Sequence, residues 1–205
     1  YLGQYDMLKG IKKGGTFLLN SIWDVEETKK RLPDYVKKQI ADNDVKFYIL
    51  NATKVAAEIG LPGRTNTIMQ SAFFKLANVI PYDDAVKYMK DAIQKSYGKK
   101  GADVVNKNNA AVDKGSGELV KVDVPADWKN LSSKIDSSCG ECPDFVKKIA
   151  FPVNHLAGDD LPVSAFVDIA DGTMPQGSAA FEKRGIAVNV PEWASENCIQ
   201  CNQCS

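Results

Sequence analysis

The residues best suited to chemistry in this sequence are three cysteines near its end. Cys198, Cys201 and Cys204 are each separated by two residues, which matches the first three ligands of the C-x2-C-x2-C-x3-C-P run of iron-sulfur proteins. Such a loop curls successive thiolates around one cluster, and backbone amides that point at the sulfur atoms offset their charge. We therefore predict that these cysteines bind a 4Fe-4S cluster whose fourth ligand lies outside this chain. The alternative is three incidental thiols at a chain end.

Two further cysteines, Cys139 and Cys142, form a second C-x2-C pair. Because tetrahedral zinc accepts four thiolates, this pair could join Cys198 and Cys201 in a zinc-stapled interaction module. The gap between the pairs is longer than common zinc spacings, which favours the iron-sulfur interpretation. Five cysteines confined to the last third of the chain do not fit a disulfide framework. A dithiol role or ordinary surface thiols remain open for the second pair.

The composition is that of a globular protein with one main domain and an appendage. The chain has 205 residues, of which 44% are hydrophobic and 25% charged, and one core commonly holds about 100–200 residues. Basic and acidic residues balance at 26 each, so we expect no nucleic acid partner. Because no apolar run approaches the roughly 20 residues of a membrane span and no leader pattern opens the chain, we expect a soluble, non-secreted protein.

The secondary structure predicted from the sequence indicates an α/β fold, and these elements must position the candidate residues. Runs of β-formers bounded by turn residues place strands at 16–19 and 45–50. Between them, a helical charge pattern is interrupted at Pro33, which predicts two short helices. Apolar spacing then predicts helices over 66–80 and 81–97 and a third one through Val104 and Val112. From about residue 116 to 160 the pattern weakens, and we expect a linker that wraps the surface.

Several short sequence motifs in the second half resemble those of pyruvate:ferredoxin (flavodoxin) oxidoreductases. They are Phe-Glu-Lys-Arg-Gly-Ile-Ala at 181–187, Val-Pro-Glu-Trp at 190–193 and Glu-Asn-Cys-Ile-Gln-Cys-Asn at 196–202. The small EKR domain of that family is named after the motif Glu182-Lys183-Arg184. The segment 161–166 resembles the opening of that domain. Residues 10–21, 63–66, 69–70, 72–76 and 97–101 resemble the third domain of the family. The resemblance weakens between 116 and 160, where the second cysteine pair has no counterpart.

The resemblance implies a domain plan and a longer protein. It implies a layered α/β/α third domain over 1–115 that lacks its N-terminal part, a linker over 116–158 and an EKR domain over 159–195. Residues 196–205 would begin a ferredoxin-like cluster domain. The chain starts with Tyr1 and not with Met, and Ser205 follows a cysteine in mid-motif. We therefore expect the chain to be a piece of a longer polypeptide.

The resemblance also implies an activity. Enzymes of this family convert pyruvate and coenzyme A to acetyl-CoA and CO2, and they reduce ferredoxin or flavodoxin. Thiamine diphosphate would be bound by other domains, so the chain alone is expected to be inactive. The third domain contributes to the coenzyme A site, with Asn66 and Asn108 at the positions that match contact residues. The expected partners are the other domains and the electron carrier, in a homodimer located in the cytoplasm or in an anaerobic energy organelle of a eukaryote.

The same residues also have local explanations. Asn66 lies where a helix begins, so its ordinary role would be an N-cap, although Arg64 beside it could pair with a phosphate. Asn108 lies on an apolar helical stripe and needs a hydrogen-bond partner, which a neighbouring backbone group could supply. Glu182-Lys183-Arg184 alone indicates a solvated charge run used for docking. His155, the single histidine, is expected to be structural.

Overall fold

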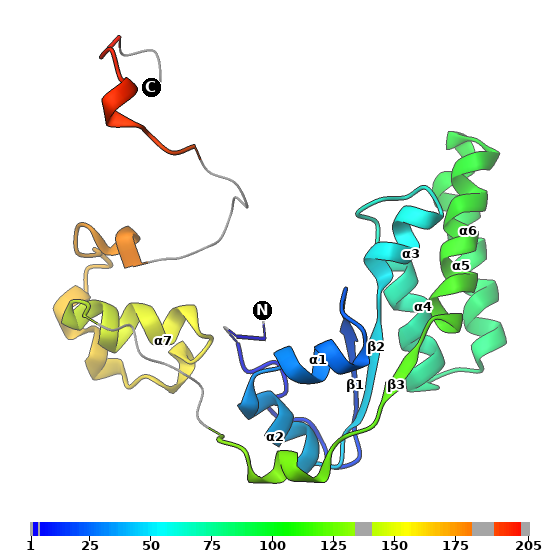
Figure 1. Ribbon diagram of the computed structural model, residues 1–205, viewed down its shortest axis with the longest axis horizontal. Helices are drawn as coiled ribbons and strands as arrows, with labels where there is room; N and C mark the ends of the chain where they lie inside the picture. Colours follow the sequence, from blue (N-terminus) through cyan, green and yellow to red (C-terminus); the bar gives the residue numbers. More distant parts are fainter. Residues whose placement is uncertain (1, 4, 134–140, 182–190, 202–205) are drawn as a thin grey trace. The chain divides into compact units, whose positions relative to one another are not determined.

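The computed structural model describes residues 2–3, 5–133, 141–181 and 191–201. The chain divides into two compact units, Tyr1–Asp136 and Ser137–Ser205. The first unit contains a sheet with helices packed around it, and the second consists of short helical segments (Figure 1). No helix in the described ranges combines the length and the apolar character that a membrane crossing requires.

A mixed three-stranded sheet lies at the centre of the first unit. β1 (Thr16–Asn20) pairs in parallel with β2 (Lys46–Leu50), so that the two strands are in register from end to end. β3 (Val120–Val122) pairs antiparallel with the other edge of β2. The two strands predicted from the sequence are therefore confirmed, whereas β3 lies where the sequence predicts a linker.

Two short helices connect β1 to β2, as the proline between them predicts. α1 (Val25–Arg31) begins at Asp24, whose carboxylate accepts a hydrogen bond from the Glu27 amide at 2.8 Å. Pro33 then occupies the N-cap position of α2 (Asp34–Asp42) with a φ of −58°. Its missing N–H costs nothing there, because the first amides of a helix have no intrahelical partner.

Four helices follow β2. α3 (Ala52–Glu58) was not predicted, whereas α4 (Asn66–Ala77), α5 (Tyr82–Tyr97) and α6 (Ala102–Gly117) are the three helices that apolar spacing predicts. α4 ends earlier than expected because Asn78 adopts a left-handed conformation with a φ of 47°. Such a residue at the end of a helix turns the chain out of the helical path.

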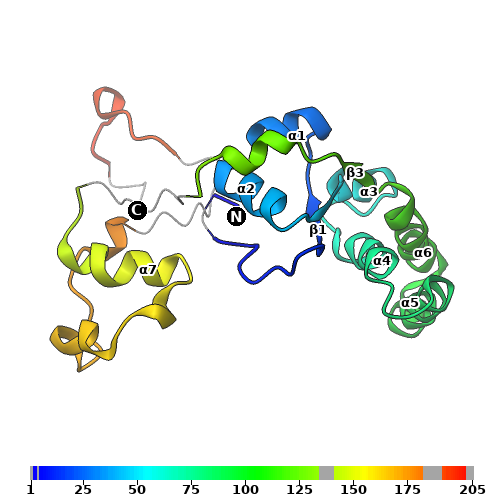
Figure 2. The same cartoon turned by 90° about the horizontal axis from the view of Figure 1, so that it is seen from below.

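Both faces of the sheet are covered by helices, which confirms the layered α/β fold. Phe47 and Ile49 of β2 pack with α1 and α2, whereas Leu50 packs with α3, α4 and α6. Side chains of a strand point alternately to its two faces, so β2 supplies both cores. Figure 2 shows the helices on either side of the sheet. A smaller cluster of Met89, Ile93, Val105 and Val112 joins α5 to α6.

The segment after α6 also contributes to the core. Beyond β3, the 3-10 turn η2 (Ala126–Asn130) packs against α2 and buries Trp128, which is only 6% exposed. The Lys38 ammonium group donates to the Lys129 carbonyl oxygen at 2.6 Å and ties the turn to α2. The linker interpretation misses this packing because β3 has three residues, two of them exposed, so its alternation is too short to recognise.

The second unit is built around one short helix with a π-helical turn. The turn η3 (Val146–Ala150) runs directly into α7 (Phe151–Asn154). Pro152 lacks an N–H and its ring would clash with a carbonyl one α-helical turn earlier, which the wider π-helical spacing relieves. His155 stacks on Phe151 at a ring distance of 3.9 Å, and its Nδ1 lies 2.8 Å from the Phe151 oxygen. This packing is the structural role expected for the histidine.

Short 3-10 turns complete the described part of the second unit. They are η4 (Gly158–Asp160), η5 (Val163–Ile169), η6 (Ser178–Phe181) and η7 (Ser195–Asn197). Glu182, Lys183 and Arg184 lie outside the described residues, as do Cys139 and Cys204.

Candidate functional site

The start of α4 presents uncapped amide groups beside Arg64. Thr65 occupies the N-cap position, and its side chain makes no capping hydrogen bond. Asn66 is the first helical residue and is exposed, so the expectation that it caps the helix is wrong by one position. The first amides of a helix carry a partial positive charge that attracts anions. With the exposed Arg64 guanidinium next to them, these groups suit a negatively charged ligand.

Asn108 lies in the first half of α6 and is half-buried. Its Nδ2 donates a hydrogen bond to the Val104 carbonyl oxygen at 2.8 Å. This is the backbone partner that a purely structural role predicts. An amide side chain offers two N–H donors and one carbonyl acceptor, so one bond leaves Asn108 with further capacity for a ligand.

The first half of α4 lies beside the last third of α6, because a Cβ added at Gly115 would lie 2.9 Å from the Ser71 Cβ. The chain reverses between α4 and α5 at Asn78, and between α5 and α6 at the turn η1 (Gly98–Lys100). α4 and α6 therefore run in the same direction (Figure 1). Their crossing is fixed by Ser71, whose hydroxyl donates to the Val112 carbonyl oxygen at 2.6 Å.

The loop that carries Arg64 also touches α6. Gly60, with a φ of +75°, lies so close to Lys107 that an added Cβ would be 3.3 Å from the lysine Cε. Lys107 precedes Asn108 directly and is paired with Asp103 at 2.7 Å. The structure therefore brings the loop of Arg64 beside the helical segment of Asn108. Among the described interactions, no hydrogen bond or ion pair joins Arg64, Asn66 and Asn108, so a shared role requires a molecule between them.

The cysteine loop follows η7, and its two described thiols, Cys198 and Cys201, are free and exposed. The Gln200 amide donates to the Cys198 sulfur at 3.4 Å, and Gln200 adopts a left-handed backbone with a φ of 54° to do so. The pKa of the Cys198 thiol is lowered from its ordinary value, first by the Trp193 side chain and then by the Gln200 amide. Donors of this kind stabilise the thiolate that a metal requires.

These features fit an iron-sulfur ligand better than a zinc site. Thiolates with amide donors at the sulfur are the ligands of iron-sulfur clusters. Within the described residues, no three His, Cys, Asp or Glu side chains converge on a common metal position; the third predicted ligand, Cys204, lies outside that part of the chain. Cys142 takes part in a disulfide bond, which removes its sulfur from zinc ligation. The zinc alternative therefore gains no support.

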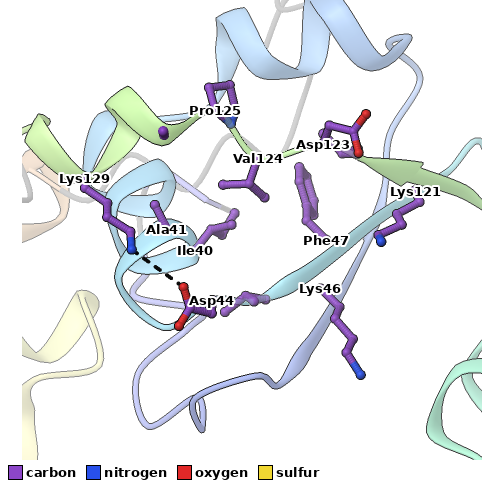
Figure 3. Close-up of a pocket in the computed structure, with 13 residues that line it drawn as sticks. Ile40, Ala41, Asp44, Lys46, Phe47, Lys121, Asp123, Val124, Pro125 and Lys129 are labelled. Atoms are coloured by element: carbon purple, nitrogen blue, oxygen red, sulfur yellow. Dashed lines mark ion pairs between the residues drawn. The ribbon is translucent and has the colours of Figure 1, made fainter.

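A separate hollow of about 430 Å³ lies beside the start of β2. Figure 3 shows its apolar floor, formed by side chains such as Ile40, Phe47 and Val124, and an ion pair at its rim. That pair joins Asp44 to Lys129 at 3.6 Å. None of the residues predicted from the sequence to bind a ligand lines this hollow.

Comparison with known proteins decides the family. A family model described as "Pyruvate ferredoxin/flavodoxin oxidoreductase" matches residues 1–118, more than half of the chain. The chain belongs to the pyruvate ferredoxin/flavodoxin oxidoreductase family. A second model, described as the EKR domain of unknown function, matches residues 134–187. These matches confirm the family resemblance that the sequence motifs indicate.

Relatives from the same family match the chain along its whole length. The pyruvate:ferredoxin oxidoreductase of Moorella thermoacetica is 53% identical over 205 residues, which are 100% of this chain and 17% of that protein. The pyruvate-flavodoxin oxidoreductase of Enterobacter agglomerans is 52% identical, with the same coverage. A solved structure, the pyruvate oxidoreductase subunit PORC of Thermotoga maritima, is 21% identical with a TM-score of 0.44 over 57% of each chain. The chain thus spans 17% of the length of these two sequence relatives.

The structure adds one residue that sequence reasoning missed. Trp193 belongs to the motif Val-Pro-Glu-Trp by which the family was recognised, and its side chain is the first cause of the lowered pKa of Cys198. Nothing in that motif indicates this influence. The roles of Arg64, Asn66, Asn108 and the three cysteines as ligand contacts stay predictions.

Proposed function

We propose that this chain is one segment of a longer enzyme, termed the complete enzyme, which converts pyruvate and coenzyme A to acetyl-CoA and CO2. The observation that carries the proposal is the 53% identity along the entire chain to a pyruvate:ferredoxin oxidoreductase. The electrons would pass to ferredoxin or flavodoxin, because relatives of nearly equal similarity are named for each carrier. We place the complete enzyme, as a homodimer, in the cytoplasm or in an anaerobic energy organelle.

Within that enzyme, the first unit would contribute to the coenzyme A site. Arg64 and the uncapped amides at the start of α4 form a positive end suited to a phosphate of coenzyme A. Asn66 and Asn108 would hold polar groups of the same molecule by hydrogen bonds, since Asn66 is exposed and Asn108 is only half-buried. These side chains would orient coenzyme A without entering its covalent chemistry.

The second unit would lead into the electron-transfer path. Cys198, Cys201 and Cys204 would bind a 4Fe-4S cluster, which supplies one-electron transfer when it is bound. The Gln200 amide donates to the Cys198 sulfur and would stabilise the charge of this ligand. Thiamine diphosphate would be held by other domains of the complete enzyme. For that reason, the chain alone is predicted to show no pyruvate-dependent dye reduction.

Substitution of Asn108 by alanine in the complete enzyme tests the coenzyme A assignment. Loss of one hydrogen bond of about 0.5–1.5 kcal/mol should raise the apparent KM for coenzyme A roughly twofold to tenfold. Release of CO2 from pyruvate, measured separately, should be unchanged because Asn108 does not contact the substrate that loses CO2. Asn108→Ala also removes only a local bond to Val104, so the fold should be preserved.

Asn106→Ala is the matched control, because Asn106 is exposed and lies two positions away on the same helix. This variant should leave the apparent KM for coenzyme A unchanged. An unaltered affinity in Asn108→Ala would reject the assignment of Asn108. A parallel fall in CO2 release would indicate general damage to the active site and would reject it as well.

A further inference from the structure

β1 lies at one edge of the sheet, and part of its backbone points away from the sheet. The strand order is β1-β2-β3, so only one side of β1 is paired. The Gly15 carbonyl oxygen and the Ser21 amide, which flank β1, both bond to β2, at 2.8 and 3.0 Å. Because every second residue of a parallel strand bonds the neighbouring strand, the amide and carbonyl groups of Thr16, Leu18 and Asn20 point outward. No hydrogen bond given for the described residues uses these outward groups.

The side chains of β1 are those of an inner strand. Phe17 and Leu19 pack against one core and Leu18 against the other, and none of the five residues of β1 is charged. A strand that is apolar on both faces is typical of the interior of a parallel sheet. Phe17 and Leu19 are nevertheless only half-buried. Their register partners on β2, Phe47 and Ile49, are 0% and 4% exposed, so a further strand beside β1 would complete the cover.

The two edges of the sheet differ in how they are protected. β3 has three residues with Lys121 at its centre, and short strands and lysines are common ways to block an edge. β1 is longer and uncharged, and exposed apolar side chains lie at both of its ends. Ile22 follows it and is 67% exposed, and Met7, 55% exposed, lines a hollow of about 290 Å³ beside its first residues. An unprotected apolar edge of this kind suits the addition of a strand.

We propose that the free edge of β1 binds an extended segment of the complete enzyme, which adds a further strand to the sheet. The segment would lie outside the 205 residues, because these residues cover only 17% of the relatives from Moorella thermoacetica and Enterobacter agglomerans. Since both faces of β1 are covered, the segment should be an uncharged run of about five residues rich in β-formers. The proposal rests on the proposed function, because it requires the complete enzyme, and it adds the surface by which the first unit joins the rest of that enzyme.

Hydrogen exchange, read residue by residue by mass spectrometry, tests this pairing in the complete enzyme and in the 205-residue chain. The amides of Thr16, Leu18 and Asn20 should exchange at least about 100-fold more slowly in the complete enzyme than in the chain alone. The amides of Phe17 and Leu19 face β2 and are the matched control, so they should exchange slowly in both. Fast exchange of the outward amides in the complete enzyme would overturn the proposal. Equally slow exchange in the chain alone would show that the edge is closed without the rest of the enzyme and would overturn it as well.

Cross-linking identifies the occupant of the edge. A photo-reactive p-benzoylphenylalanine in place of Thr16 occupies the exposed first residue of β1, about 5 Å from an added strand. We expect the complete enzyme to cross-link to one segment outside the 205 residues. A cross-link to the second unit, or to β1 of another copy, would overturn the proposal. Pyruvate-dependent dye reduction by the unsubstituted enzyme is measured separately: its absence would reject the proposed function, whereas the exchange rates would still decide the pairing.

Discussion

Replacement of Gly115 by alanine tests whether the crossing of α4 and α6 holds the first unit together. Gly115 is buried in α6. A Cβ added there would lie 2.9 Å from the Ser71 Cβ and 3.1 Å from the Ile68 carbonyl carbon, and closer still to the Ile68 oxygen. Two of these three atoms belong to the α4 backbone, so no side-chain rotation relieves the clash.

The magnitude follows from three contributions. Overpacking costs about 1–3 kcal/mol, and a clash with backbone places Gly115→Ala near the upper value. Separation of the helices would weaken the buried bond from Ser71 to Val112, which contributes about 0.5–1.5 kcal/mol. Alanine has a higher helix propensity than glycine, which returns about 1 kcal/mol. The expected net loss in the free energy of unfolding is about 2.5–3.5 kcal/mol.

The assay is urea denaturation of the 205-residue chain, followed by circular dichroism. Gly117→Ala is the matched control, since it lies in the same helix and a Cβ there would meet nothing within 4 Å. It should be as stable as the wild type or up to about 1 kcal/mol more stable, from helix propensity alone. If Gly115→Ala were as stable as Gly117→Ala, the close crossing would not limit stability and the reasoning would be refuted.

Two further predictions concern the first unit. Burial raises the pKa of Tyr35 above its ordinary value of about 10. The stability that the folded protein gains from the neutral Tyr35 phenol is therefore complete below that pH and is lost as pH rises through the folded-state pKa. Denaturation at a series of alkaline pH values should show this loss in the wild type and a flatter dependence in Tyr35→Phe; identical curves would contradict it. Asp24→Ala removes the cap of α1 and should lower the free energy of unfolding by about 1 kcal/mol in urea, and no change would show that the cap is dispensable.

The sequence predicts those elements whose signals are local. Pro33 separates α1 from α2 because one residue both removes a donor and restricts the backbone. α4, α5 and α6 are long enough for their apolar spacing to be visible. α3 has seven residues and β3 has three, so neither completes enough of a period to be recognised. β3 forms because β2 offers an open edge, and that is a property of the folded sheet.

The candidate sites divide in the same way. The spacing of Cys198, Cys201 and Cys204 predicts a cluster from chemistry alone. Asn66 and Asn108 are named by resemblance alone, because no spacing rule relates residues on two separate helices. A shared role of such residues therefore requires a known relative to suggest it.

The two candidate sites draw their geometry from different sources. Asn108 is positioned by a helix whose neighbours cross it in a tightly packed contact at Gly115, so its position depends on burial in the first unit. Cys198 is exposed and accepts a hydrogen bond from the amide of Gln200, two positions away. If both proposed sites are correct, a packing change in α6 should alter the affinity for coenzyme A and leave the cluster unchanged. The proposed coenzyme A contacts would be supported by a core, whereas the cysteine loop would depend on short-range bonds and on the metal that it would bind.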